Sequence, residues 1–370
     1  NEYMLPKMPL NITACLSRVK EGDVPDDLRK RIIDWIFYGI SSGTLYPRNY
    51  SSIAASLVAV HPELRDSSDT GYFSWTMSIK NKFKNTRKRM PEGNSQVDSQ
   101  KEKVKMRKQG GSAAGASKTA FHRETAVKAF ELDPLFVDET VNFMKKELKK
   151  PAPDMAKVSD AMKRTAAARR KSVESMNLAE FLGTYPALTL KEQILSECCL
   201  LTGIQADSAL RGMLQEFGDA IFNAAEGKRA ALATLALARA RMDAVEGFAK
   251  TCAREVGALA LLPFLLKERG DEVFRALDPD KLFGNPTLLF TGEDPWTSGS
   301  LCVVCEDVQI DVLDFAAGIS VVFGMYWAYN IQYVASARHT LSVLERLMGI
   351  NSTKLSVRAV KVLTALKARS

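Results

Sequence analysis

Apolar residues recur at helical spacing in three separate runs between residues 25 and 90. The first run follows Asp26 and Asp27, and the second opens after Pro47, both of which are typical helix starts. The third run keeps its apolar residues on one face: Tyr72, Trp75, Ile79 and Phe83. The pattern therefore predicts a small module of three helices over residues 25–90, preceded by an irregular, proline-punctuated segment over residues 1–24.

Residues 91–120 carry no hydrophobic period. They hold a charged run, Lys101–Lys108, and a glycine-rich run, Gly110–Gly115, a composition typical of flexible basic linkers. The glycine-rich run does not predict a phosphate-binding loop. Lys118 and Thr119 come two residues too late for that loop, and no hydrophobic strand precedes it.

Helical periodicity returns over residues 121–370. Asp133 and Pro134 are an N-cap and a first helical position, and they open the first helix of this domain. Further helices are expected at about residues 154–171, 190–203, 207–225, 228–247, 249–268, 314–333, 336–348 and 354–368. Short strands are expected at Thr287–Phe290, Leu301–Val304 and Val308–Leu313, with Glu306 and Asp307 in a hairpin turn.

The predicted fold class is therefore mainly α: a small trihelical basic module plus a larger helical domain with a minor β-hairpin near residues 300–313. One stretch of the larger domain, Phe315–Ala337, contains no charged residue and is long enough to cross a bilayer. It includes Asn330 and Gln332 and lies between amphipathic elements. We therefore predict a buried central helix with no membrane span, in which small residues such as Gly318 and Gly324 permit close packing.

Charge is distributed unevenly along the chain. Residues 1–90 carry 14 basic and 9 acidic side chains, residues 91–171 carry 18 and 11, and residues 172–370 carry 19 and 23. The basic first half suggests a polyanionic partner, either nucleic acid or an anionic membrane surface. The chain shows no signal-peptide layout, and its scattered cysteines indicate a reducing compartment, so we expect a nuclear or cytoplasmic protein.

No metal, cofactor or small-molecule site is predicted. Cys302 and Cys305 form a lone pair, whereas structural zinc requires four ligands, and the chain has three histidines, none near this pair. In a strand these two side chains would also point to opposite faces. No serine nucleophile motif is present, and we expect a protein that is not an enzyme.

The third predicted helix carries the strongest functional signal because cations follow its apolar face. A basic last helix in a trihelical module resembles the way helix-turn-helix proteins contact DNA. We therefore predict nucleic-acid or chromatin binding by this helix, with Lys80, Lys84, Arg87 and Lys88 on phosphate. The predicted binding residues are Lys80, Asn81, Lys82, Lys84, Asn85, Arg87, Lys88 and Arg89.

Several alternatives remain open at this stage. The large helical domain could act as a protein-interaction scaffold, with the basic helix binding an acidic partner. Peripheral membrane binding would use the same charges, and a solvated basic face would bind nothing specific. Two other basic runs, Lys101–Lys108 and Arg164–Lys171, are each either a nuclear localisation signal, a phosphate-contacting arm or an ordinary solvated surface.

Several short motifs also resemble a known family. They are Leu45–Tyr50, His61–Asp66, Gly71–Trp75 with Lys82–Lys88, Tyr185–Leu188, Cys302–Cys305 and Phe323–Tyr326. In these motifs the chain resembles the uncharacterised region of the sterile alpha motif domain-containing protein 3 family and related fish proteins. The sterile alpha motif itself is not visible in this sequence, so the resemblance does not imply oligomerisation through it. The shared motifs look structural, and they imply no activity.

Overall fold

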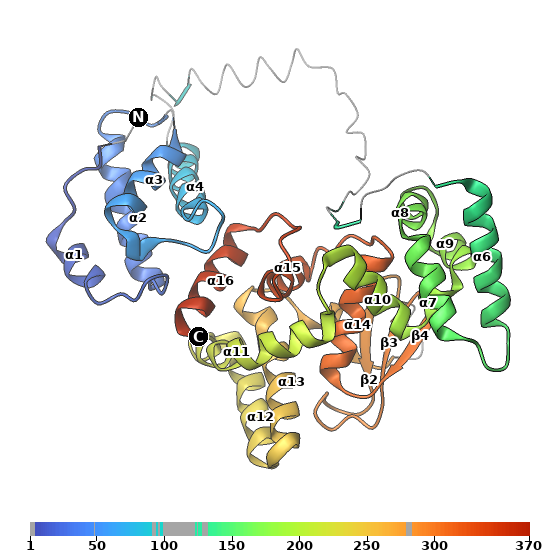
Figure 1. Ribbon diagram of the computed structural model, residues 1–370. Helices are drawn as coiled ribbons and strands as arrows, with labels where there is room; N and C mark the ends of the chain where they lie inside the picture. Colours follow the sequence, from blue (N-terminus) through green and yellow to red (C-terminus); the bar gives the residue numbers. More distant parts are fainter. Residues whose placement is uncertain are drawn as a thin grey trace. The chain divides into compact units, whose positions relative to one another are not determined.

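A computed structural model describes residues 4–47, 49–90, 94, 97–98, 123, 125–127, 132–278 and 283–370. The chain forms two compact units (Figure 1). Unit 1 consists of residues 1–119 together with residues 355–370, and unit 2 consists of residues 120–354. Residues 355–370, expected from the sequence to lie in a domain over residues 121–370, group with the N-terminal helices in unit 1.

Unit 1 contains the three helices that the spacing of apolar residues predicted, together with α1 before them and α16 from the C-terminal end. Its helices are α1 (Leu10–Leu16), α2 (Asp26–Ser41), α3 (Tyr50–Val60), α4 (Phe73–Arg89) and α16 (Val357–Arg369), with a short 3-10 turn at η1 (Pro62–Leu64). Helix α1 lies in the segment expected to be irregular. Its Ile12 and Leu16 are buried and join the core of the unit, so this segment is part of the fold.

The core of unit 1 fixes the position of α4. Trp75, Ile79 and Phe83 are fully buried against residues of α2 and α3. The rings of Phe37 and Phe83 meet edge to face, with 4.8 Å between their centroids. Burying each of these large apolar side chains stabilises the fold by about 2–3 kcal/mol, so the apolar face of α4 is held firmly in the core.

The C-terminal helix α16 joins unit 1 through specific polar contacts. The backbone N–H of Ser67 donates to Oγ1 of Thr364 at 2.8 Å, and Arg369 forms an ion pair with Asp23 at 2.9 Å. Gly22 has a φ of +83° and lies so close to Thr364 that an added Cβ would be 3.0 Å from its methyl carbon. The turn that carries Gly22 therefore requires glycine for both its conformation and this close approach.

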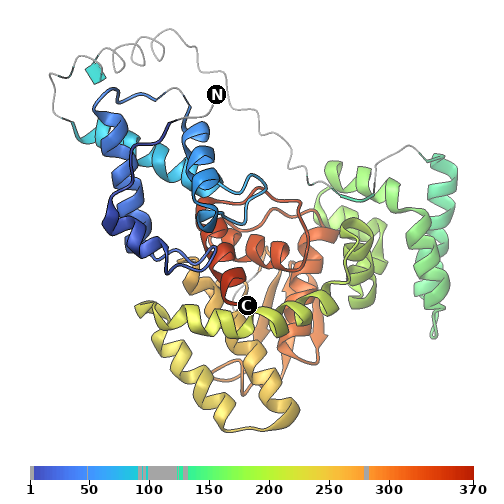
Figure 2. The same cartoon turned by 60° about the vertical axis from the view of Figure 1, so that its left-hand side comes forward.

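Unit 2 is mostly helical. Its helices are α6 (Pro134–Leu148), α7 (Met155–Arg164), α8 (Ala166–Ser175), α9 (Leu178–Thr184), α10 (Lys191–Thr202), α11 (Ala206–Glu226), α12 (Leu232–Asp243), α13 (Gly247–Leu265), α14 (Phe315–Ala328) and α15 (Arg338–Leu347). Short 3-10 turns lie at η2 (Pro186–Thr189), η3 (Arg229–Ala231) and η4 (Gly270–Glu272). As predicted, the side chain of Asp133 caps α6 and Pro134 is its first residue. Helices α12 and α13 lie side by side, as the yellow pair in Figures 1 and 2 shows.

A small sheet of four strands completes unit 2. Its strands are β1 (Phe274–Ala276), β2 (Thr287–Phe290), β3 (Leu301–Cys305) and β4 (Val308–Val312), in that spatial order. The predicted hairpin is confirmed: β3 and β4 pair antiparallel, and the turn contains Glu306 with a φ of +48°. Strand β1 was not predicted, and it pairs parallel with β2 over three residues.

Helix α14 lies at the centre of unit 2, as the uncharged stretch predicted. Each of its residues is buried, and it packs against α10, α11 and the sheet. Gly318 lies directly over β2, where an added Cβ would be 2.5 Å from a methyl carbon of Leu288. This contact explains why a small residue is needed there. Within the described parts of the chain, no helix has the length and apolar character to cross a membrane.

Candidate nucleic-acid interface

The start of α4 is fixed by a buried polar network. The carboxylate of Asp66 accepts hydrogen bonds from the backbone N–H of Ser74 at 2.7 Å and of Ser68 at 3.0 Å. Its negative charge also complements the positive end of the α4 dipole. Nε1 of Trp75 donates to the carbonyl of Leu64 at 2.6 Å. The direction of α4 is therefore set by hydrogen bonds as well as by its apolar face.

A buried arginine of α2 completes this network. Arg29 donates to Oγ of Ser74 at 2.7 Å, and its guanidinium lies 3.8 Å from the ring centroid of Trp75. Burial lowers the pKa of Arg29 to about 10, although the charges of Asp66 and Asp26 oppose that shift. Arg29 is therefore cationic at neutral pH and provides a cation–π contact beneath the helix.

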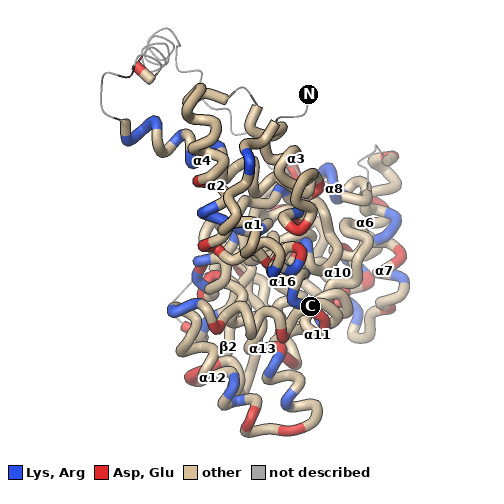
Figure 3. Tube along the Cα trace, turned by 90° about the vertical axis from the view of Figure 1, so that its left-hand side faces the viewer, with Lys and Arg blue, Asp and Glu red and all other residues tan. Residues whose placement is uncertain are grey.

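Six of the eight predicted binding residues are exposed. They are Lys80, Asn81, Lys84, Asn85, Lys88 and Arg89. Because residues four apart lie on the same side of a helix, Lys80, Lys84 and Lys88 form one row, and Asn81, Asn85 and Arg89 form the next. Figure 3 shows the basic positions gathering along the C-terminal half of α4. We call these six residues the basic face.

Lys82, also among the predicted residues, has a structural role instead. It is half-buried, its Nζ lies 2.5 Å from Oδ1 of Asp34 on α2, and it lies 5.2 Å from the ring centroid of Phe37. Its charge is neutralised within unit 1. The helical spacing placed Lys82 correctly on α4, but nothing in the local sequence indicated that Asp34 would face it.

Arg87 is also turned inward. Its Nη1 donates to the carbonyl of Leu45 at 2.6 Å and to the hydroxyl of Tyr50 at 3.2 Å. Its guanidinium lies 4.4 Å from the ring centroid of Tyr46. Arg87 therefore ties the end of α4 to the segment before α3, and it is a positioning residue for the basic face.

Among the described residues, the four cations of the basic face have no partner of opposite sign. Lys80, Lys84, Lys88 and Arg89 form no ion pair with any residue that the structure describes. The three lysines repeat along the helix about every 6 Å, as the 1.5 Å rise per residue dictates. A rigid row of unpaired cations is suited to binding the regularly spaced phosphates of a nucleic acid.

The other two basic runs differ from the basic face. Lys101–Lys108 lies outside the described residues. In Arg164–Lys171, Arg169 is buried and pairs with Glu197, with 3.2 Å from Nε to Oε1. Arg170 is also buried and donates to the carbonyl of Arg123 at 3.1 Å. The interpretation of this second run as a phosphate-contacting arm is therefore wrong for Arg169 and Arg170, whose charges are used inside unit 2.

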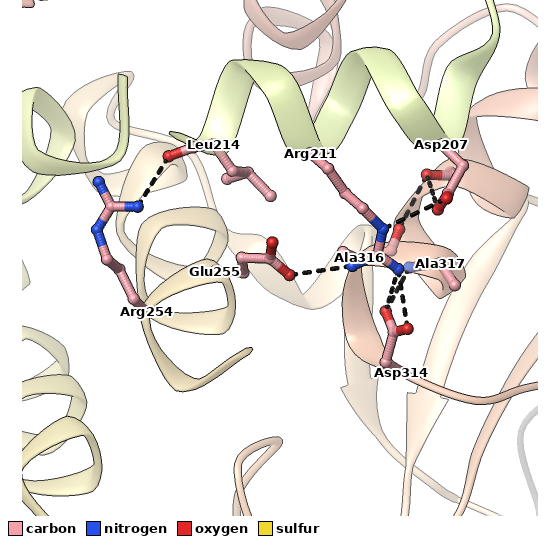
Figure 4. Close-up of polar contacts among 9 residues, drawn as sticks. Asp207, Arg211, Leu214, Arg254, Glu255, Asp314, Ala316 and Ala317 are labelled. Carbon is pink, nitrogen blue, oxygen red and sulfur yellow. Dashed lines mark hydrogen bonds and ion pairs between the residues drawn. The ribbon is translucent and has the colours of Figure 1, made fainter. Parts of the chain in front are cut away.

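A polar cluster in unit 2 joins three helices around Arg211 of α11 (Figure 4). The guanidinium binds Asp314 at 2.8 Å, Glu255 at 3.2 Å and Asp207 at 3.3 Å. Burial raises the pKa of Glu255, opposed by the charge of Arg211. Asp314 also caps α14 by accepting from the N–H of Ala317 at 2.8 Å. Since each carboxylate binds the same guanidinium, the cluster braces α11, α13 and α14 against one another.

The Cys302–Cys305 pair lies on β3. Cys305 is buried, and burial raises the pKa of its thiol to about 12. Cys302 is half-buried, and burial raises its pKa as well. Thiols of raised pKa are poor nucleophiles and poor metal ligands at neutral pH. Among the residues that the structure describes, no three His, Cys, Asp or Glu side chains are grouped so as to hold a metal ion.

Comparison with known proteins supports the resemblance seen in the sequence. Residues 137–190 match the family model of the sterile alpha motif domain-containing protein 3 helical domain. Human sterile alpha motif domain-containing protein 3 is 27% identical over 228 residues, which are 59% of this chain and 43% of that protein. The mouse protein is 25% identical over 232 residues, or 60% and 44% of the two chains. The resemblance to this protein is confirmed.

The matched family segment runs from α6 to the residue after η2, so it lies in unit 2 and does not include α4. The chain spans less than half the length of the curated relatives it matches. No solved structure matches this chain. The case for a functional site therefore depends on the geometry of the basic face.

Proposed function

We propose that this protein binds nucleic acid, as DNA, RNA or chromatin, through the basic face of α4, without catalysing a reaction. The observation that supports the proposal is the set of exposed cations Lys80, Lys84, Lys88 and Arg89, which form no ion pair with a described residue and lie on a helix whose opposite side is fixed in the core. Phosphate contacts by these cations would release the counterions condensed on a nucleic acid. Because the backbone of α4 is already ordered, binding would cost no further backbone conformational entropy.

The six residues have distinct roles in this proposal. The four cations contact phosphates, which supplies affinity without sequence preference. Asn81 and Asn85 lie in the neighbouring row, and their amide groups can both donate and accept hydrogen bonds at base edges. Lys82 and Arg87 act indirectly, by holding α4 against α2 and the segment before α3. A DNA or chromatin target would place the protein in the nucleus.

The test is a matched pair of double charge reversals in the full chain. Lys84→Glu with Lys88→Glu should weaken binding to a 20-mer oligonucleotide by about 10- to 100-fold, because two phosphate contacts become repulsive. Lys146→Glu with Lys149→Glu changes two exposed lysines at the end of α6 and alters the net charge equally. This control should leave the affinity nearly unchanged.

The salt dependence of the affinity is a second quantity measured in the same experiment. The slope of log affinity against log salt concentration should fall in the α4 variant by about 1.8 for a duplex probe, at about 0.9 per phosphate contact, and by about 1.4 for a single-stranded probe, at about 0.7 per contact. It should be unchanged in the α6 variant. An equal loss in both variants would contradict the proposal, since net charge alone would then explain binding. Absence of any binding by the wild type would favour the alternative of a protein-interaction scaffold.

A further inference from the structure

An exposed aromatic ring lies on α2, the helix that packs against α4. Tyr38 of α2 is 68% exposed, although it directly follows Phe37, which is buried in the core. The two rings meet at 5.5 Å between centroids with an interplanar angle of 69°. One edge of the Tyr38 ring is thus supported by Phe37, while most of the ring remains open to solvent.

Contacts between α2 and α4 fix where Tyr38 stands. Arg29 meets Ser74, Asp34 meets Lys82, and Phe37 meets Phe83, so the two helices run side by side in the same direction. Tyr38 follows Asp34 by four residues and lies one turn farther along the same side of α2. On α4, Asn85 and Arg89 follow Lys82 by three and seven residues and continue along its side in the same way.

We propose that the ligand of the basic face is a single-stranded nucleic acid, one of whose bases stacks on Tyr38. This inference rests on the proposed function. Tyr38 then lies on the Arg89 side of α4, and the lysine row follows farther around the helix, beyond Asn81 and Asn85, so a strand that crosses this face would meet an aromatic ring and then cations. In a duplex the faces of the bases are covered by stacking, whereas a single strand offers them to an aromatic side chain.

The N-terminal half of α4 supports this choice over duplex binding. In a helix-turn-helix protein the first residues of the recognition helix reach the base edges in the major groove. Here Ser74, Trp75 and Ile79 are buried, and the Asp66 carboxylate lies at the helix start. The exposed polar residues of α4 all lie in the C-terminal half of the helix, the half that runs beside the end of α2 where Tyr38 lies.

The experiment measures binding of the full chain to a fluorescent thymidine 20-mer and to a 20-base-pair duplex at several salt concentrations. The wild type should bind the single strand more tightly. Tyr38→Leu should weaken single-strand binding by about tenfold, since an aliphatic side chain cannot replace base stacking, and leave duplex binding unchanged. Tyr38→Phe should retain wild-type affinity because stacking does not need the hydroxyl.

The salt slope separates the two contributions. Tyr38→Leu should leave the slope unchanged, whereas Lys84→Glu should reduce it for both probes. Tighter duplex binding, or an equal loss for both probes in Tyr38→Leu, would overturn the single-strand assignment while leaving nucleic-acid binding intact. Failure of the wild type to bind either probe would overturn the proposed function and this inference together.

Discussion

Two basic runs of the chain look alike in the sequence and differ in the folded protein. The run on α4 leaves Lys80, Lys84 and Lys88 exposed and without an ion-pair partner among the described residues. The run on α7 and α8 buries Arg169 and Arg170, whose guanidinium groups donate to a carboxylate and to backbone carbonyls of unit 2. A run of cations is therefore a binding surface only where the fold supplies no acceptors for it.

Whether a cation of these runs is exposed or buried depends on partners elsewhere in the sequence. Arg169 receives its counter-charge from Glu197 on α10, and Nη1 also donates to the carbonyl of Met162 at 2.5 Å. Among the cations of α4, the described partners that are distant in the sequence bind Lys82 and Arg87, through Asp34 and Leu45. The same helix thus contains both kinds of cation, one turned inward and the other outward.

The largest expected effect comes from removing the counter-charge of Arg169. Glu197→Gln should lower the free energy of unfolding of unit 2 by about 3–5 kcal/mol, because it leaves a buried guanidinium without a compensating charge. Hydrogen exchange of peptides from α8 and α10 in urea would measure this loss. Glu192→Gln, at an exposed position of α10, is the matched control and should change stability by less than about 0.5 kcal/mol. Similar losses of unfolding free energy in both variants would show that the Arg169–Glu197 pair does not stabilise α8 in unit 2.

Adjacent residues at the end of α4 provide the next test. Arg87→Met removes two hydrogen bonds and should lower the free energy of unfolding of unit 1 by about 1–2 kcal/mol. Lys88→Met removes an exposed charge and should leave stability nearly unchanged while weakening nucleic-acid binding. Thermal denaturation and oligonucleotide titration of both variants would check this. The division of α4 into positioning and binding residues fails if Lys88→Met is the more destabilising change.

Local signals in the sequence predicted most of the fold. The apolar spacing of Trp75, Ile79 and Phe83 placed α4 and its buried face, and the β-branched runs around Glu306 placed the hairpin. The expected helix over residues 154–171 is interrupted at Thr165, where α7 ends and α8 begins. Apolar spacing continues across this position and did not indicate the interruption.

The parts that sequence reasoning missed depend on long-range contacts. The amphipathic pattern of α16 predicted a helix but could not show that Thr364 would meet Ser67, almost the whole chain away. For the candidate site, exposure of the two rows on α4 followed from helical spacing. The inward turn of Arg87 depends on contacts with Leu45 and Tyr50, and the inferred place of Tyr38 near Arg89 depends on the packing of α2 against α4.

A smaller effect is expected from single lysines of the basic face. Lys84→Ala should weaken oligonucleotide binding by about three- to fivefold and reduce the salt slope by about one, because one phosphate contact is lost. Arg164→Ala, in the other basic run, is the matched control. Arg164 is paired with Asp160 at 3.0 Å, so its removal should change neither quantity. A reduced slope in the control would mean that both runs contact phosphate.

The smallest expected change in stability concerns an arginine that is neither buried like Arg169 nor exposed like Lys84. Arg241 of α12 is half-exposed and pairs with Asp294, at 2.5 Å between Nη2 and Oδ2. Burial acts to raise the pKa of Asp294, but hydrogen bonds from Arg241 and from Thr297 together outweigh it, so the pKa lies below its ordinary value. A carboxylate with a lowered pKa contributes stability above its unfolded-state pKa, and that contribution is lost as the pH falls.

Asp294→Asn keeps an oxygen that can accept from the N–H groups of Trp296 and Thr297 but removes the charge opposite Arg241. At pH 7 it should lower the free energy of unfolding of unit 2 by about 0.5–1 kcal/mol, a value limited by solvent screening of the half-exposed arginine. The difference from wild type should narrow as the pH falls below about 4, where the unfolded carboxylate becomes protonated. Urea unfolding at pH 3, 4, 5 and 7 would measure this. A difference independent of pH would mean that the negative charge of Asp294 makes no contribution to stability, and that the Arg241–Asp294 contact acts only through packing and neutral hydrogen bonds, unlike the buried Arg169–Glu197 pair of α8 and α10.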